Sequence, residues 1–212
     1  VDGLMFTGSS AVGRRILASQ VDRIDRLIAL ELGGKNASIA LDDCDIERTA
    51  RAVAFSAYVT AGQRCTATSR LIVTRGVARP LIERIASIVR QIRVGYPLSP
   101  ASDAPVFMGP VIDAAARSRL LEAQRAAQAA GFQAVVPGGE HALETHAGHY
   151  VRPALHVAPA PTTDVPGYTD AELFGPDLAV YEVESAEDAF ALANKGWSGL
   201  TAAILSARRG VF

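Results

Sequence analysis

Short apolar runs and longer stretches with helical spacing alternate along the chain. The apolar runs predict strands at residues 4–7, 27–31, 37–41, 71–73, 134–136, 178–183 and 200–205. Apolar residues that recur at helical spacing predict helices over residues 11–19, 46–57, 81–92, 113–130 and 185–194. Strands and helices that alternate at these lengths favour an α/β domain with a mostly parallel sheet.

Residues at the expected element ends refine the boundaries. Asp43 is the predicted N-cap of the helix that follows it, because its carboxylate can accept a hydrogen bond from an unpaired N–H of the first turn. Ser185 and Asp188 resemble a capping box, and Gly131 is a typical stop for the helix before it. Residues 95–104 and 137–149 are rich in turn-forming residues and are expected to be loops.

The composition narrows the class of protein and of partner. Of the 212 residues, 49% are hydrophobic and 20% are charged, which is typical of a globular protein. Lys and Arg number 21 and Asp and Glu 22, a balance that argues against binding to nucleic acid or to a membrane surface. Every apolar run is shorter than the ~18–20 residues that span a bilayer. Cys44 and Cys65 do not make a disulfide framework, which favours a reducing, cytoplasmic setting.

The segment Gly8-Ser-Ser-Ala-Val-Gly13 lies between an expected strand and an expected helix. This geometry presents backbone N–H groups and the positive end of a helix dipole, which suit a phosphate. The spacing imitates a P-loop, but Arg14 and Arg15 stand where a P-loop has Lys and Ser or Thr, and this argues against nucleotide hydrolysis. From these residues alone, a phosphate site and a plain glycine turn are equal alternatives.

Glu31 is a candidate general base. It ends an apolar strand and precedes two glycines, and desolvation beside Ile28 and Leu30 would raise its pKa toward neutrality. The alternative is an ordinary strand-end charge beside a Gly-Gly turn, which these residues alone favour.

Cys65 is a candidate nucleophile that follows an expected helix end and a glycine. Its thiol becomes reactive only if the site, to which Arg64 would contribute, lowers the thiol pKa; otherwise it is a buried inert cysteine. The acidic neighbours of Cys44 disfavour a thiolate there.

Two further patterns are open to more than one interpretation. His141, His146 and His149 lack metal-ligand spacing, so a solvated loop is favoured over a metal site. Glu172-Leu-Phe-Gly-Pro176 is either a turn that leads into a strand or a loop at the edge of a ligand site.

Taken together, these segments resemble the aldehyde dehydrogenase superfamily over essentially the whole chain. Four motifs stand in the order of that family: Phe6-Thr-Gly-Ser9 with Gly13, Glu31-Leu-Gly-Gly34, Gly62-Gln-Arg-Cys65 and Glu172-Leu-Phe-Gly-Pro176. The resemblance implies the C-terminal part of an NAD-binding domain at residues 1–34 and most of a catalytic domain at residues 35–212, with an incomplete C-terminus. Because subunits of this family are much longer, we expect an internal fragment that is a poor enzyme or inactive alone, and a homo-oligomer for the full-length protein.

The resemblance also implies a role for each motif. Cys65 matches the nucleophile, which converts the aldehyde into a thiohemiacetal and, after hydride transfer, a thioester. Glu31 matches the base that activates water to release the carboxylic acid. NAD is the implied cofactor, with NADP as the alternative. The implied cofactor-binding residues are Gly8, Ser9, Ser10, Ala11, Val12, Gly13, Leu32, Gly33, Glu172 and Phe174.

Within the superfamily, residues 1–10, 60–66 and 107–109 look most like the members that oxidise N-succinyl-L-glutamate 5-semialdehyde in bacterial arginine catabolism. Residues 34–36 depart from that subgroup, and residues 67–70 look closer to dehydrogenases of 2-oxoglutarate semialdehyde. Both aldehydes carry an anionic far end, so Arg64 is a hypothetical carboxylate-binding residue. The alternatives from other classes are a non-catalytic binding module of the same fold and a phosphate-binding hydrolase.

Overall fold

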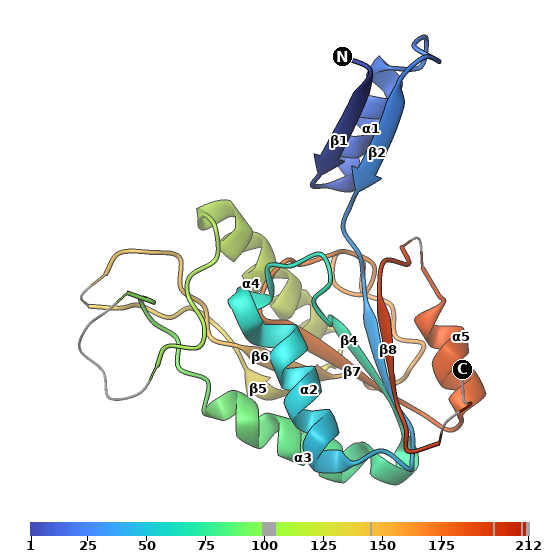
Figure 1. Cartoon of the computed structure of the whole chain (residues 1–212). Helices are drawn as coiled ribbons and strands as arrows, with labels where there is room; N and C mark the ends of the chain where they lie inside the picture. The colour runs from blue at the N-terminus through green and yellow to red at the C-terminus, as the bar shows by residue number, and fades with distance from the viewer. Residues whose placement is uncertain (99–104, 145, 197, 209, 211–212) are drawn as a thin grey trace.

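The computed structural model describes residues 1–98, 105–144, 146–196, 198–208 and 210. Two sheets organise the chain, one with two strands and one with six. In Figure 1 the two-stranded sheet and its helix stand above a larger body that holds the other elements. The expected loop at residues 95–104 lies partly outside the described residues, because 99–104 do not belong to them. No helix within the described ranges is long and apolar enough to cross a membrane.

The N-terminal unit is a strand–helix–strand motif made of β1 (Gly3–Thr7), α1 (Ser10–Ser19) and β2 (Leu27–Glu31). β1 pairs in parallel with β2, from Gly3 opposite Leu27 to Thr7 opposite Glu31. The Ser9 side chain caps α1 by accepting a hydrogen bond from the Val12 N–H at 3.4 Å. The C-terminal ends of both strands and the N-terminus of α1 therefore meet at one edge of the unit.

The larger body is built on the six-stranded sheet, whose order is β5-β6-β7-β4-β3-β8. Every neighbouring pair is parallel except β5 with β6. The strands are β3 (Ala37–Ala40), β4 (Arg70–Thr74), β5 (Gln133–Pro137), β6 (Ala154–Val157), β7 (Asp177–Val183) and β8 (Ala202–Leu205). The helices are α2 (Ile46–Tyr58), the 3-10 turn η1 (Val59–Gly62), α3 (Arg75–Arg90), α4 (Ala114–Ala129) and α5 (Ala186–Ala193).

Helices cover both faces of this sheet, which is why its central strands are buried throughout. β4 shows the alternation: Leu71 and Val73 pack with α2 and α3, whereas Ile72 packs in the cluster that contains α5. Figure 1 shows α2 and α3 in front of the sheet and α5 at its right. The predicted α/β class with a mostly parallel sheet is confirmed.

Three details differ from the sequence-based expectations. The N-cap of α2 is Asp45, whose carboxylate accepts from the Arg48 N–H at 2.9 Å, and not Asp43. Asp43 instead binds the Ser206 hydroxyl at 2.9 Å and forms an ion pair with Arg208 at 3.0 Å, so a distant contact takes it away from the helix. α3 begins at Arg75, before the expected start, and ends before residue 92, and β6 lies where the sequence predicts no element.

Candidate functional site

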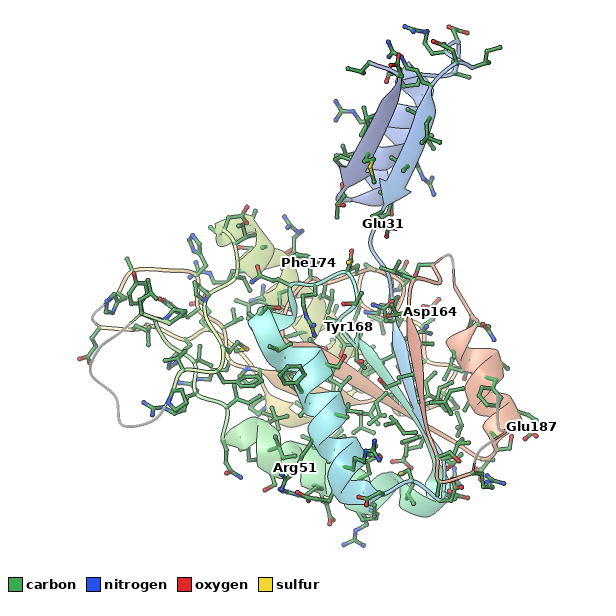
Figure 2. All side chains as sticks on the ribbon, in the orientation of Figure 1. Glu31, Arg51, Asp164, Tyr168, Phe174 and Glu187 are labelled. Carbon is green, nitrogen blue, oxygen red and sulfur yellow. The ribbon has the colours of Figure 1, made fainter. Side chains whose placement is uncertain are left out.

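A pocket of about 650 Å³ gathers most of the candidate residues. Its lining comes from the N-terminal unit and from the larger body, so segments far apart in the sequence meet there. The candidates that line it are Gly8, Ser9, Glu31, Leu32, Gly33, Arg64, Cys65, Glu172 and Phe174. Ser10, Ala11, Val12 and Gly13 follow in α1 and do not belong to its lining. In Figure 2, Glu31 lies at the end of β2 that faces the larger body, and Phe174 lies at the top of that body.

Cys65 lies on a loop that leaves α2 through a left-handed turn. Thr60, Ala61 and Gly62 have φ values of 58°, 54° and 66°. A side chain on Gly62 would collide with the backbone carbonyl of Gly175, so glycine is required for two reasons. Strained non-glycine residues of this kind often mark functional loops. Phe174, in the facing loop, also has a positive φ of 50°.

The loop that carries the candidate nucleophile Cys65 is held by Asn36, a residue that the sequence-based reasoning did not select. The Asn36 side-chain nitrogen donates to the carbonyl oxygens of Cys65 at 2.6 Å and Ala67 at 2.9 Å. Asn36 is buried, and its side-chain oxygen accepts from the Thr201 N–H at 3.2 Å. A buried amide that is fully bonded in this way fixes the backbone around it. The signal in the sequence is an amide residue directly before a short strand that is mostly apolar.

Gln63 provides a second attachment for this loop. Its side chain donates to the Pro110 carbonyl oxygen at 3.2 Å and accepts from the Ile112 N–H at 2.8 Å. Cys65 itself is a free, half-buried cysteine that lines the pocket. The loop therefore presents the thiol to the pocket while its backbone is tied to two neighbouring segments.

Cys44 is also a free cysteine, but it differs from Cys65 in its burial and its place. It is buried in the core beside α2 and α3, outside the pocket. Burial raises the pKa of the Cys44 thiol, and the charges of Asp43 and Asp45 raise it further, while a hydrogen bond with Thr49 opposes them. The expectation that a thiolate is disfavoured at Cys44 is confirmed.

Glu31 lines the pocket together with Cys65, but the expected desolvation of its carboxylate is wrong. The side chain is exposed because Glu31 is the last residue of β2, in a sheet of two strands. Ile28 and Leu30 are half-buried in the same strand and do not remove Glu31 from solvent.

Glu172 reaches the segment that follows β2. Its carboxylate accepts from the Gly34 N–H at 3.3 Å, and a side chain on Gly33 would overlap this carboxylate. Burial raises the pKa of Glu172, against the Gly34 hydrogen bond and the charge of Lys35, which lower it. The loop that carries Glu172 and Phe174 thus lies directly against residues 33–34.

Two arginines bring positive charge to the pocket. Arg64 is half-buried and donates from one guanidinium nitrogen to the Ser56 carbonyl oxygen at 3.2 Å. Arg119, on α4, lines the same pocket and was not selected from the sequence, because nothing in its own helix links it to Cys65. Contacts of this kind between distant elements carry no local signal.

The histidines do not assemble into a metal site in the described part of the chain. There, no group of three or more His, Cys, Asp or Glu side chains is placed to hold a metal ion. The His146 ring stacks on Tyr96 with a centroid distance of 4.2 Å. The only remaining histidine of the sequence, His156, is buried in the larger body beside Asp177.

Comparison with known proteins supports the grouping of these motifs. The sequence profile of the aldehyde dehydrogenase family matches residues 1–211. N-succinylglutamate 5-semialdehyde dehydrogenase 1 of Caulobacter vibrioides is 39% identical over 209 residues, which cover 97% of this chain and 42% of the relative. Betaine aldehyde dehydrogenase of Cereibacter sphaeroides is 35% identical over 202 residues, which cover 95% of this chain and 40% of that protein.

The fold is shared with a solved structure that contains a dinucleotide. Betaine aldehyde dehydrogenase of Staphylococcus aureus, crystallised in complex with NAD+, superposes with a TM-score of 0.88 at 30% identity. The superposition covers all of this chain and 40% of that one. The chain thus spans about 40% of the length of the relatives it matches.

Proposed function

Because the chain belongs to the aldehyde dehydrogenase family, we propose that it carries the reaction centre of an NAD-dependent aldehyde oxidation. The observation that carries this proposal is the meeting of Cys65, Glu31 and Glu172 in one pocket with Gly8 and Ser9, which precede α1. The product is the carboxylic acid, released from a covalent intermediate on Cys65. NADP is the alternative cofactor.

Cys65 acts first in the proposed mechanism. Its thiolate attacks the aldehyde carbon, a carbon–sulfur bond forms, and the carbonyl electron pair moves to oxygen to give a thiohemiacetal. When bound, the nicotinamide of the dinucleotide supplies the acceptor for the hydride that leaves this carbon. The collapse of the oxyanion leaves a thioester on Cys65. The Cys65 backbone N–H is a candidate donor to the oxyanion.

Glu31 acts second. Its carboxylate lines the same pocket and is exposed, so it can accept a proton from a water molecule there. The hydroxide attacks the thioester carbon, the carbon–sulfur bond breaks, and the Cys65 thiolate is regenerated. An exposed carboxylate can fill this role, because it has only to orient and deprotonate a water molecule beside the thioester.

The residues that line the pocket suit the pyrophosphate of a dinucleotide. Gly8 and Ser9 contribute its wall at the N-terminus of α1, where unpaired backbone N–H groups and the helix dipole favour phosphate. Ser10, Ala11, Val12 and Gly13 continue that turn. Gly13 lets α1 pack closely at the end of β2, since a side chain there would collide with Leu32, the residue after β2. Leu32, Gly33, Glu172 and Phe174 are proposed to hold the nicotinamide and its ribose.

The proposed substrate is an aldehyde with an anionic far end, such as N-succinyl-L-glutamate 5-semialdehyde. Arg64 and Arg119 both line the pocket, and arginine binds carboxylates with paired hydrogen bonds. On the side of the pocket that these arginines line, a cationic aldehyde such as betaine aldehyde is disfavoured, while the carboxylates of Glu31 and Glu172 belong to the proposed base and cofactor contacts. 2-Oxoglutarate semialdehyde has the same character and is the alternative substrate, and the full-length protein is proposed to form a homo-oligomer.

The test of this proposal has one arm on the chain itself. Brief treatment with iodoacetamide near neutral pH, followed by peptide mass spectrometry, is expected to label Cys65 and to leave Cys44 unlabelled. Equal labelling of both cysteines in the folded chain would contradict an accessible, activated nucleophile at Cys65.

The second arm measures turnover. Residues 1–212 replace the matching segment of the Caulobacter vibrioides relative, and NADH formation is followed with the three aldehydes named above. Activity that disappears in Cys65→Ser and falls strongly in Glu31→Gln supports the assigned roles. A folded chimera without activity would instead favour a non-catalytic module of this fold.

A further inference from the structure

Lys35 is a buried cation that lies outside the pocket. It follows the Gly33-Gly34 pair directly, and its ammonium donates to the Tyr168 carbonyl oxygen at 2.6 Å. The same nitrogen lies 5.5 Å from the centre of the Tyr168 ring. Lys35 lines a separate cavity of about 170 Å³ and is absent from the lining of the 650 Å³ pocket. The structure therefore does not indicate a direct contact between Lys35 and a ligand in the 650 Å³ pocket.

Tyr168, which receives this bond, is itself fixed in the core. Its side chain is fully buried, its hydroxyl donates to the Asp177 carboxylate at 2.7 Å, and its ring meets Phe132 edge-to-face at 5.2 Å. Asp177 also accepts from the Gln124 side chain at 2.9 Å. Figure 2 shows Tyr168 inside the larger body, below Phe174.

These contacts hold the Glu172–Pro176 motif at both ends. Tyr168 precedes the motif by four residues, and Asp177 follows it directly as the first residue of β7. Between them, Glu172 accepts from the Gly34 N–H at 3.3 Å. The backbone of residues 34–35 is thus joined to the Glu172 loop twice, once by Gly34 to Glu172 and once by Lys35 to Tyr168.

The charged and titratable groups around Lys35 come from β4, from β7 and from the loop that precedes β7, and Asp164, Tyr181 and Lys195 line the same cavity. Burial lowers the pKa of Lys35 to about 8, and the charge of Arg70 on β4 lowers it too. Asp177 on β7, and Asp170 and Glu172 on the loop, favour the protonated form. The ammonium form therefore predominates at neutral pH, and the amine loses its charge in mildly alkaline solution.

We propose that Lys35 is a positioning residue, which sets the place of Glu172 and Phe174 in the pocket by holding the Tyr168 carbonyl. This inference rests on the proposed function only because that function assigns Glu172 and Phe174 to cofactor binding. The link itself is a property of the folded chain. When the loop opens, the Lys35 amine reaches solvent and binds a proton more tightly, so a rise in pH disfavours opening.

The experiment measures backbone hydrogen exchange of the 212-residue chain at pH 7 and pH 9, with each rate divided by its intrinsic value at that pH. In the wild type, exchange of amides in residues 165–176 is expected to be about tenfold slower at pH 9, because opening that exposes Lys35 is coupled to proton uptake, with no change in α2 and α3. In Lys35→Met, these amides are expected to exchange fast at both pH values. Alkylation of Cys65 should be unaffected, because Asn36 holds that loop.

Lys195→Met is the matched control. Lys195 is the only other lysine, it is exposed, and it lines the same 170 Å³ cavity. Its variant should behave as the wild type does. Equal exchange of residues 165–176 in Lys35→Met and wild type would overturn the proposal, as would a rise spread evenly over the body. If Lys35→Met does not fold, the pH comparison in the wild type decides alone.

This measurement needs neither aldehyde nor dinucleotide. A negative result would remove Lys35 as a positioning residue and leave the proposed oxidation intact. Conversely, an inactive chimera with the expected exchange pattern would contradict the function and keep the link.

Discussion

The side-chain nitrogen of Asn36 lies 2.6 Å from the carbonyl oxygen of Cys65, so the first residue beyond Gly-Gly-Lys holds the backbone of the candidate nucleophile. The same nitrogen binds Ala67, and the strand β3 begins one residue later. The loop that carries Cys65 is thus attached to the start of β3 by a buried, uncharged amide.

Replacement of Asn36 by Ala is expected to destabilise the chain and to loosen the Cys65 loop. The change leaves two carbonyl oxygens without their donor, at a cost of about 2 kcal/mol in the free energy of unfolding. Urea denaturation measures this loss, and the rate of Cys65 alkylation should change with it. Asn194→Ala is the control, because its amide only binds the Phe190 carbonyl within the exposed end of α5. An unaltered alkylation rate in a destabilised Asn36→Ala would contradict the positional role.

Gly62→Ala is expected to destabilise the chain by about 3 kcal/mol, because the substitution combines a left-handed φ with a backbone collision. Thermal unfolding followed by circular dichroism measures the effect. The comparison is Gly199→Ala, where an added Cβ meets nothing within 4 Å. A Gly62→Ala protein as stable as Gly199→Ala would show that the loop adopts another backbone path in solution.

Stability should increase with pH in the mildly alkaline range because of Lys35. An unfolded lysine titrates near pH ~10.4, whereas burial lowers the pKa of Lys35 to about 8 in the fold. Between these values the unfolded chain binds the extra proton, so the free energy of unfolding rises with pH, by at most about 1.4 kcal/mol per pH unit.

Urea unfolding from pH 7 to about pH 9.5 measures this slope, below the range near pH ~10 where unfolded tyrosines titrate. That upper limit matters because burial raises the pKa of Tyr181 to about 12, so stability falls again at higher pH. Lys35→Met removes the buried titrating amine, so the rise between pH 8 and 9.5 should disappear and a slight fall should remain, because burial raises the pKa of the Cys44 thiol. A rise that persists in Lys35→Met would assign it to another group.

Arg64→Ala is expected to reduce the oxidation of acidic aldehydes more than that of neutral aldehydes of equal length. The expected loss in kcat/KM is about 10- to 100-fold for the acidic substrate, which corresponds to about 1.5–3 kcal/mol for one charge-assisted hydrogen bond. Steady-state kinetics of the chimera with both substrates measure it. Similar losses on both would assign Arg64 to the loop, through its bond to Ser56, and not to charge recognition.

Much of the fold was predictable because its signals are local. The strand at residues 27–31 and the capping of α5 by Ser185 follow from a few adjacent residues. β6 was missed because it is four residues long and its burial depends on pairing with β7 and β5, which lie elsewhere in the sequence. Asp43 shows the same limit, since its partner Arg208 is 165 residues away.

The same difference between local signals and contacts of distant residues applies to the candidate site. Its motifs were found as short segments, and the structure brings Cys65, Glu31 and Glu172 to one pocket. The exposure of Glu31 and the arrival of Arg119 from α4 depend on how separate elements are arranged, so no local pattern contains them. The roles of these residues stay predictions.

Glu31 and Asn36 lie on one short stretch of backbone, but they belong to different bodies of the structure. Asn36 is tied to the Cys65 loop, whereas Glu31 ends a strand of the N-terminal unit, and residues 32–35 join them. A small rotation of the N-terminal unit about this connector would move the base and leave the nucleophile in place. Glu31 and the proposed phosphate contacts at Gly8 and Ser9 would then move together relative to Cys65, so one change in the connector would alter both thioester formation and thioester hydrolysis.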